Sequence, residues 1–584
     1  MRAAIPVIAL VFTMLPAVAG GQYRTLDDRF PAPAFASRAE WDARAAYVRE
    51  HILASAGLLP LPDKAPLNPV VFDELKRDGY SVSKVYFESL PGFFVTGNLY
   101  RPVGEGPFPA VLSAHGHWTY GRFENSPLVS GPGRAITLAR QGFVVFSYDM
   151  IGYNDSRQLT HTFGGPREHL WGLSLAGLQL WNSMRGVDFL ESLPYVKRDA
   201  IGITGESGGG TQTFMLAASD ARVAAAVPVN MISLHMQGSC LCENLPGLRL
   251  DTNNAEIAAT IAPRPMLMIS ATGDWTNETL ELEYPAVRAL YTMAGAADRV
   301  HAVRFTADHN YNKDSREAMY GWMARWLKGA PSADRLPEPS FTPDALPALL
   351  VFHGRPLPDR AATADQLTRS WIDGAKRQLA VAPMSVRAAA LRHALGFAHE
   401  FASKSPAMTP TRRPPVLVAE TTPDVEAALR KAGHSVRVIQ FTPFDTAAAD
   451  KVRHFDTYNR TAASQRVADI VAALRAQPGA ILVASGDAAL AGALASAIET
   501  PRLAILDVQG FDTGGDDGFL SHLYIPGLRR AGDVQTASEI AQGRLVIHNA
   551  GPHFTASGAR VQQAQLTPAQ IRDLVRQEKS PSTH

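Results

Sequence analysis

Cysteine is almost absent from this chain. Only Cys240 and Cys242 occur among 584 residues, so no framework of disulfides holds the fold together. A bridge between residues two apart in sequence would be strained, and we therefore expect two reduced thiols. No other metal ligand is evident close to them along the chain, so the sequence predicts neither a metal site nor a cofactor.

Blocks of one charge and long apolar runs are also missing. The chain has 56 Lys and Arg against 55 Asp and Glu, which gives a formal net charge of +1. Neither a nucleic acid nor an anionic membrane surface is therefore an expected partner. After residue 19, no run is long and apolar enough to cross a bilayer.

The N-terminus has the form of a secretory signal. Met1 and Arg2 precede a short apolar run that ends in Ala17-Val18-Ala19. The run is too short for a spanning helix and is interrupted by prolines. We expect residues 1–19 to be removed and the protein to be secreted or periplasmic.

Strands and helices alternate along residues 79–330. A leader, expected to be flexible, and an amphipathic helix at 41–58 fill residues 20–78. A hairpin at 80–100 follows, and then short apolar runs separated by segments of helical periodicity, of which 170–193 is the longest. This pattern predicts a doubly wound, mostly parallel sheet, the α/β-hydrolase arrangement.

A serine motif lies at the centre of this pattern. Gly205-Glu206-Ser207-Gly208-Gly209 stands between an apolar strand and a predicted helix. G-x-S-x-G in this context is typical of a nucleophile held in a strained strand-to-helix turn. The sequence therefore predicts Ser207 as the nucleophile.

A serine nucleophile needs a histidine base and an acid that orients it. In this fold the acid and the histidine follow the serine in that order, each after a strand. Asp274 and His309 fit both the order and the positions. Glu278 and Asp308 remain alternatives for the acid, and His301 for the base.

Two backbone N–H groups should stabilise the oxyanion. We expect them to belong to Gly208, directly after the nucleophile, and to His117, in the loop after the strand 109–114. His115 in the same loop is expected to be structural. The predicted substrate contacts are Trp275, Trp118, Arg122 and Glu206, although Glu206 could instead brace the nucleophile turn.

Residues 348–584 begin the alternating pattern again after a proline-rich linker at 331–347. The segment Pro246-Gly-Leu-Arg249 recurs as Pro526-Gly-Leu-Arg529. The number of residues from Ser207 to the first copy equals the number from Asp487 to the second. We interpret this smaller α/β domain as a degenerate, non-catalytic repeat. Asp487 stands at the serine position, and a counterpart of His309 is expected to fall beyond the chain end.

Residues 40–330 resemble acetylxylan-esterase-like bacterial α/β-hydrolases. The resemblance lies in His115-Gly-His-Trp118, in residues 149–156, in the serine motif, in residues 242–249 and in the Asp274/His309 pair. It implies a serine esterase that acts on acetyl or other simple esters of plant polysaccharides. Glucuronoyl esterases of similar fold carry arginine where this chain has Gly208.

Two other functions remain open at this stage. One is a serine peptidase of the prolyl-oligopeptidase type, although no propeller-blade repeat is visible. The other is a non-catalytic carbohydrate-binding protein, which the complete set of triad residues disfavours.

Overall fold

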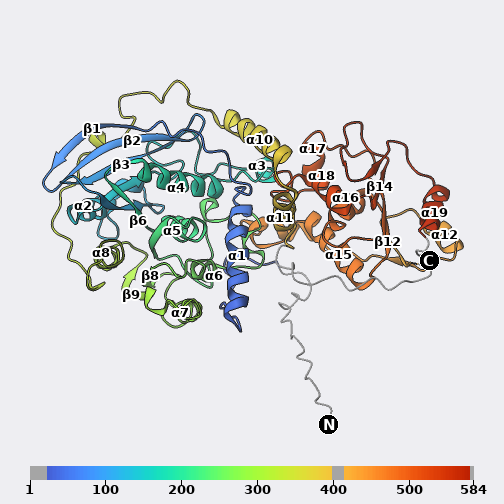
Figure 1. The fold of residues 1–584 in the computed structure, drawn as a ribbon, viewed down its shortest axis with the longest axis horizontal. Helices are drawn as coiled ribbons and strands as arrows, with labels where there is room; N and C mark the ends of the chain where they lie inside the picture. The colour runs from blue at the N-terminus through green and yellow to red at the C-terminus, as the bar shows by residue number, and fades with distance from the viewer. Residues whose placement is uncertain (1–22, 398–413, 579–584) are drawn as a thin grey trace, which may run out of the picture.

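The chain folds into two α/β lobes that lie side by side (Figure 1). The computed structural model describes residues 23–397 and 414–578, and the predicted signal at 1–19 lies outside them. Within the described residues, no helix combines the length and the apolar character that spanning a bilayer requires.

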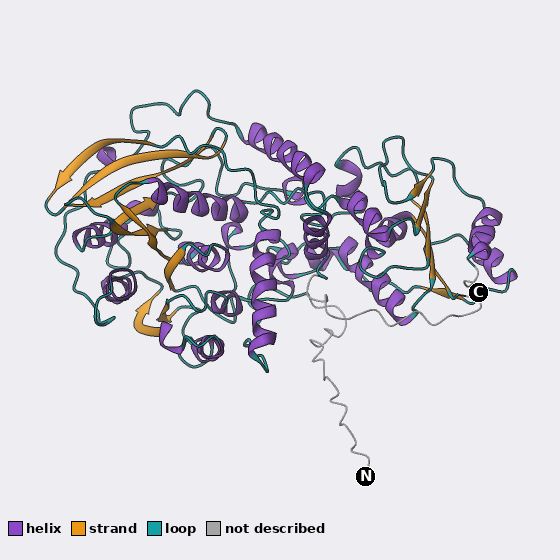
Figure 2. Cartoon of the chain, in the orientation of Figure 1, coloured by secondary structure: helices purple, strands orange, loops and turns teal. Residues whose placement is uncertain are grey.

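The first lobe contains a nine-stranded sheet in the order β1-β2-β3-β5-β4-β6-β7-β8-β9. From β1 through β2 and β3 to β5, each strand pairs antiparallel with the next, and the strands from β5 to β9 are all parallel. Figure 2 shows the strands of the two lobes in orange among the helices. This strand pairing confirms the predicted α/β class and the hairpin. The strands are β1 (Val70–Arg77), β2 (Tyr80–Leu90), β3 (Phe93–Pro102), β4 (Phe108–Ser113), β5 (Val144–Tyr148), β6 (Val196–Glu206), β7 (Val223–Val229), β8 (Met266–Gly273) and β9 (Val300–Asp308).

Helices cover both faces of this sheet. Trp181 and Phe214 lie in the core on one face, whereas Ile136 and Met323 lie in the core on the other. Neighbouring residues of β5, Val144 and Val145, point into these two different cores, as the alternation of a strand requires. The helices are α1 (Arg38–Ser55), α2 (Gly131–Arg140), α3 (Pro166–Leu170), α4 (Leu175–Ser192), α5 (Gly208–Ser219), α6 (Asn254–Ala259), α7 (Glu283–Met293) and α8 (Lys313–Lys328).

Two local predictions in this lobe are wrong. The expected flexible leader is packed, because Phe30 is buried in the first core and its N–H donates to Leu234 O at 2.7 Å. The helix expected at 170–193 is present as α4 but begins only at Leu175, and the short helix α3 ends at Leu170 before it. Gly172 between them has a φ of 68°, and the Ser174 hydroxyl caps the new helix start.

The second lobe repeats the parallel part of the first. Its six strands have the order β11-β10-β12-β13-β14-β15, and every pair is parallel. This is the order β5-β4-β6-β7-β8-β9 of the first lobe, as the predicted repeat requires. The strands are β10 (Val416–Ala419), β11 (Val436–Val438), β12 (Ile481–Ser485), β13 (Leu503–Asp507), β14 (Leu545–His548) and β15 (Arg560–Val561).

The remaining helices follow the first sheet along the chain. They are α9 (Leu346–Leu349), α10 (Ala364–Val381), α11 (Met384–Leu395), α12 (Pro423–Lys431), α13 (Thr446–Ala449), α14 (Phe455–Tyr458), α15 (Ala462–Ala476), α16 (Gly486–Ala495), α17 (Asp517–His522), α18 (Asp533–Ala541) and α19 (Pro568–Gln577).

The repeat corrects two details of the predicted degenerate site. Ser207 has a φ of 56° between β6 and α5, and the residue with the matching φ of 59° between β12 and α16 is Gly486. Asp487 is therefore one residue past the turn. The counterpart of β9 is β15, so the loop that corresponds to the His309 loop begins at Gln562, within the chain. The second lobe thus has neither a nucleophile nor a base at these positions.

The two lobes meet through equivalent segments. Gly247 N–H donates to Asp456 O at 2.7 Å, and Gly527 N–H donates to His169 O at 2.8 Å. Gly247 and Gly527 are the glycines of the two P-G-L-R segments. His169 lies in the short helix α3, which precedes α4 and the nucleophile strand β6. Asp456 lies in the short helix α14, which precedes α15 and β12, the counterparts of α4 and β6. Such reciprocal contacts are those of a two-fold interface.

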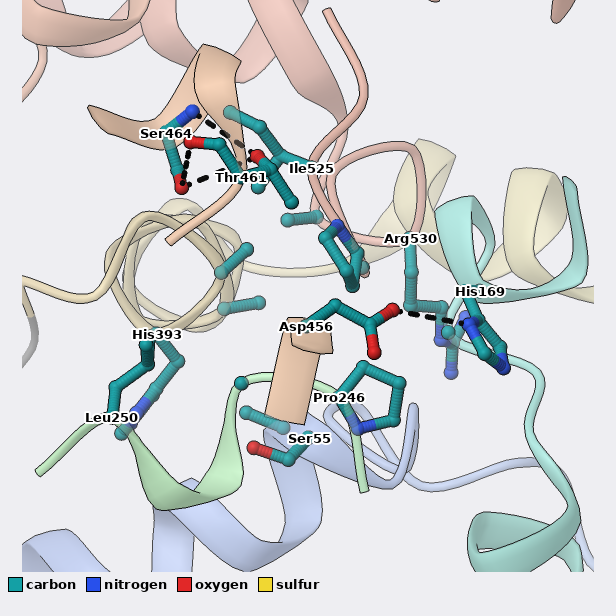
Figure 3. A pocket seen from close by; sticks show the side chains of 18 of the residues that line it. Ser55, His169, Pro246, Leu250, His393, Asp456, Thr461, Ser464, Ile525 and Arg530 are labelled. Carbon is teal, nitrogen blue, oxygen red and sulfur yellow. Dashed lines mark hydrogen bonds and ion pairs between the residues drawn. The ribbon is translucent and has the colours of Figure 1, made fainter. Parts of the chain in front are cut away.

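A pocket lies at this interface (Figure 3). His169 Nδ1 is 3.3 Å from Asp456 Oδ2 across the lobes, and Pro246 and Arg530 help to line the walls. Ser207 and His309 are not among the lining residues. The pocket belongs to the contact between the lobes and not to the predicted triad.

The predicted domain boundary at residue 348 is displaced, because α10 packs on the first lobe. Leu367, Trp371 and Ile372 are buried in the same core as Trp181, whereas the core of the second lobe includes Leu391 of the next helix. Trp371 Nε1 also donates to Trp171 O at 3.0 Å.

Replacing Trp371 by alanine should destabilise the first lobe. The buried indole leaves a cavity, and changes of this kind cost about 3–5 kcal/mol. Trp371→Phe is the matched control, because it keeps one aromatic ring in the core and loses the indole hydrogen bond, worth about 1 kcal/mol. Urea unfolding of both variants measures the difference. Equal stability of the alanine variant and the wild type would place α10 outside this core.

Candidate active site

Ser207 occupies a strained turn between β6 and α5. Its φ of 56° and ψ of −124° lie outside the regions that non-glycine residues favour. A Cβ on Gly205 would lie 2.6 Å from Gly209 O, and one on Gly209 would lie 2.9 Å from the carbonyl carbon of Ala114. Only glycine permits this approach, which leaves Ser207 at the start of α5 beside the end of β4.

Asp274 and His309 meet at the ends of β8 and β9. His309 Nδ1 lies 2.8 Å from Asp274 Oδ2. The carboxylate is almost fully buried, and its other oxygen accepts hydrogen bonds from Thr276 N at 2.8 Å and Thr276 Oγ1 at 2.5 Å. A buried carboxylate on Nδ1 fixes the tautomer that leaves Nε2 free to take a proton.

The alternative acids and the alternative base do not form such a pair, and Asp308 is exposed at the end of β9. Glu278 bonds to Arg29 at 2.5 Å in an exposed ion pair. His301 is exposed on β9 and its ring lies against Tyr284. Asp274 with His309 is therefore the acid–histidine pair that the geometry favours.

The loop after β4 reaches the nucleophile turn. A Cβ on Gly116 would lie 3.0 Å from Ser207 Cβ, and one on Gly208 would lie 2.7 Å from His117 Cε1. The two residues predicted to supply oxyanion N–H groups, Gly208 and His117, are thus in contact beside Ser207. We call residues 115–118 the oxyanion loop.

His115 holds the oxyanion loop in place, as a structural residue would. Its Nε2 accepts from Met150 N–H at 3.0 Å, which leaves the proton on Nδ1 for Gly116 O at 2.8 Å. Complete burial lowers the pKa of His115 to about 3, so the ring is neutral at physiological pH.

The prediction that Glu206 contacts substrate is wrong. Its carboxylate is buried, and one oxygen pairs with Arg134 Nη1 at 2.6 Å. The other oxygen accepts from Gly116 N at 3.1 Å and from Trp118 Nε1 at 3.0 Å. Glu206 therefore ties the nucleophile turn to the oxyanion loop, because every buried charge must find partners.

Arg122 is also not available to a substrate. Its guanidinium is buried and pairs with Asp149 and, at 2.9 Å, with Asp155, while Nε donates to Asn98 at 3.0 Å. The prediction that Arg122 contacts substrate is therefore wrong. The acidic partners come from the loop after β5, and no local pattern in the sequence indicates that this loop lies beside Arg122.

Two tryptophans predicted as substrate contacts flank the histidine. The Trp275 ring lies 4.5 Å from the His309 ring, and the Trp118 ring lies 6.2 Å from it and nearly parallel. Both are partly exposed. Their faces form apolar walls beside the predicted base.

The expectation that the cysteines lack further ligands is wrong. Within the described part of the chain, Cys240 and Cys242 lie with His117 and His161 in one group, and their ligand atoms are all within 4.8 Å of one another. His117 Nε2 is 3.0 Å from Cys242 Sγ. The histidines come from the loops after β4 and β5, so no local motif could have revealed them.

The strand order, the turn at Ser207 and the acid–histidine pair define the first lobe as an α/β-hydrolase fold. The family model described as "BAAT / Acyl-CoA thioester hydrolase C terminal" matches residues 184–293. The chain is 26% identical over 290 residues to "Putative hydrolase YtaP" of Bacillus subtilis (strain 168), a match that covers 46% of this chain and 95% of the relative.

Solved structures of esterases resemble it in part. "Methylesterase BT1017" is 29% identical, with a TM-score of 0.49, and the match covers 59% of this chain and 77% of that one. A glucuronoyl esterase from Solibacter usitatus is 15% identical, with a TM-score of 0.38, covering 51% of this chain and 99% of that one.

Asp274→Asn should lower kcat by roughly 10⁴-fold, because the amide favours the wrong histidine tautomer. Glu278→Gln is the control, since its carboxylate lies in an exposed ion pair with Arg29, and it should leave kcat within a factor of about two. Steady-state kinetics with p-nitrophenyl acetate measure both. The opposite pattern would make Glu278 the acid.

Proposed function

We propose that this protein is a serine carboxylester hydrolase. The observation that carries the proposal is the buried Asp274 carboxylate bonded to His309 Nδ1 at the strand ends that follow Ser207 in the required order. Pairing of this kind orients an imidazole as a general base. The strained Ser207 turn beside the oxyanion loop supplies the nucleophile.

The reaction has two halves. Ser207 Oγ attacks the ester carbonyl while His309 Nε2 takes its proton, and the Gly208 and His117 N–H groups stabilise the oxyanion. His309 then gives the proton to the leaving alcohol, and an acyl-enzyme remains. Water, deprotonated by the same imidazole, attacks the acyl carbon and releases the acid and Ser207.

The proposed substrates are simple esters of plant polysaccharides, acetylated xylan first among them. Trp118 and Trp275 offer aromatic faces on which a sugar ring can pack beside His309. The two charged side chains predicted as substrate contacts, Arg122 and Glu206, are neutralised by ion pairs inside the protein. These features support a neutral ester.

A side-by-side assay tests the substrate class. Acetylated xylan, p-nitrophenyl acetate and a prolyl-peptide substrate should be compared at equal enzyme concentration. Acetate release from xylan supports the proposal, while cleavage of the peptide alone would replace it with a peptidase.

We also propose that the protein is exported on residues 1–19. N-terminal sequencing of the mature protein should start at Gly20. Recovery of the intact N-terminus from the cytoplasm alone would contradict export.

Ser207→Ala should remove turnover while the fold survives. Loss of such a nucleophile costs on the order of 10⁶-fold in kcat. Covalent labelling by a fluorophosphonate should disappear together with activity, and circular dichroism checks the fold. A folded variant that keeps more than a few per cent of the wild-type rate would rule out the mechanism.

Asp487→Asn should leave turnover unchanged. Asp487 is partly exposed on α16 and lies 3.0 Å from His522 Nδ1, whereas the turn before it holds Gly486. Turnover that persists in Ser207→Ala and disappears only when Asp487 is also changed would reveal a second site.

A further inference from the structure

Four metal-ligand side chains converge beside the oxyanion loop. His117, His161, Cys240 and Cys242 place one ligand atom each within 4.8 Å of all the others. Zinc bonds of about 2.3 Å to sulfur and about 2.0–2.1 Å to nitrogen in a tetrahedron separate neighbouring ligand atoms by roughly 3.3–3.8 Å. We call these four side chains the His/Cys cluster. His117 Nε2 and Cys242 Sγ are 3.0 Å apart and no pair exceeds 4.8 Å, so shifts of up to roughly 1.5 Å would bring the ligand atoms to this geometry.

His161 presents an unpaired nitrogen in this cluster. Its Nδ1 lies 2.6 Å from Ile151 O, a bond that requires the proton on Nδ1. Nε2 therefore carries the lone pair, and it is inaccessible to solvent and has no hydrogen-bond partner. A buried nitrogen without a partner is costly, and a bound cation would satisfy it.

Glu243 orders the other ligands. It lies 4.0 Å from His117 Nδ1, on the opposite side of the ring from Nε2, which is 3.0 Å from Cys242 Sγ. Glu243 Oε2 accepts the N–H groups of Ser239 at 2.7 Å and Cys240 at 3.0 Å. At 4.0 Å the carboxylate places a negative charge behind the His117 ring without a hydrogen bond to it, and through its two backbone hydrogen bonds it shapes the cysteine turn.

The ligand chemistry selects among metals. Two thiolates with two imidazoles in a tetrahedral arrangement are typical of Zn²⁺, whereas calcium and magnesium prefer oxygen. Four protein ligands leave no open position, which is the form of a structural site. Sequence reasoning missed it because the histidines lie about 80 and 120 residues before the cysteines and meet them only at the sheet edge.

We propose that His117, His161, Cys240 and Cys242 bind one Zn²⁺ that fixes the oxyanion loop. His117 lies directly against Gly208, since a Cβ there would be 2.7 Å from His117 Cε1. Zinc bound to His117 Nε2 anchors the ring and, through it, the backbone N–H that faces the oxyanion. The consequence for catalysis depends on the proposed esterase function, whereas zinc binding does not.

Metal analysis of the full-length chain tests the binding. The protein is purified on a tag without histidine, dialysed against buffer treated to remove trace metals, and measured by plasma mass spectrometry. One zinc per chain is expected. His161→Gln and Cys240→Ser should reduce the content at least tenfold, while His301→Gln, whose histidine is exposed on β9, should keep it.

Cobalt replacement reports the type of ligand in the wild-type protein itself. Tetrahedral Co²⁺ bound to thiolates gives an intense visible spectrum and a sulfur-to-metal charge-transfer band in the near ultraviolet. Both should appear in the wild type and be lost in Cys240→Ser. A cobalt spectrum without the charge-transfer band would contradict cysteine ligation.

Removal of zinc tests the link to catalysis. A chelator should lower kcat for p-nitrophenyl acetate at least tenfold, leave circular dichroism unchanged, and be reversed by added Zn²⁺. Unchanged kcat in the zinc-free enzyme would overturn the role of the metal in holding the loop. A zinc-loaded protein without esterase activity would instead contradict the proposed function and leave the metal site in place.

Two results would overturn the metal site itself. One is a zinc content near zero after growth with zinc supplied. The other is an intact mass lower by two hydrogen atoms before reduction, which would show Cys240 and Cys242 as a disulfide.

Discussion

One buried carboxylate joins the parts of the candidate active site. Glu206 pairs with Arg134 and accepts hydrogen bonds from Gly116 N and Trp118 Nε1, so it binds the nucleophile turn to the oxyanion loop. Arg134 extends the link to the end of β4 through Ser113 Oγ at 2.9 Å. Breaking a buried pair of this kind costs about 3–5 kcal/mol, and oxyanion stabilisation needs donors fixed before the reaction.

The proposed zinc would hold the same loop from its other side. Glu206 restrains Gly116 and Trp118, whereas the His/Cys cluster includes His117 between them. A short loop has little conformational freedom once both sides are anchored, and its backbone N–H groups then keep their direction. The two anchors differ in chemistry, so the metal can be removed without disturbing the carboxylate.

The sequence predicted what local patterns encode. The strand–turn–helix context of Ser207 and the strand-end positions of Asp274 and His309 depend on chain order, which the fold preserves. The role of Arg122 could not be predicted, because its partners, Asp149 and Asp155, meet it only in the folded structure. For Glu206 the sequence left substrate contact and bracing of the turn open, and its partner Arg134 decides for bracing. The His/Cys cluster was missed for the same reason as the role of Arg122.

The matched spacing predicts the repeat correctly but misplaces the nucleophile position of the second lobe by one residue. Counting back from the repeated P-G-L-R leads to Asp487, whereas the backbone turn with the positive φ is at Gly486. Sequence spacing therefore predicts the positions of whole strands and helices better than the residue at a turn, because a deletion of one residue shifts every later residue by one position.

The P-G-L-R segment is retained in both lobes because it serves the interface and not the chemistry. Gly247 and Gly527 have φ values of 78° and 76°, and each donates its N–H across to the other lobe. In a two-fold contact each lobe supplies the same donor, so losing either one leaves a buried carbonyl without its partner. The catalytic positions of the second lobe carry no such constraint: Gly486 stands at the nucleophile turn, and the loop from Gln562 to α19 contains no histidine. The pattern is what two copies of one fold would leave if they first packed as a dimer and only one kept the reaction.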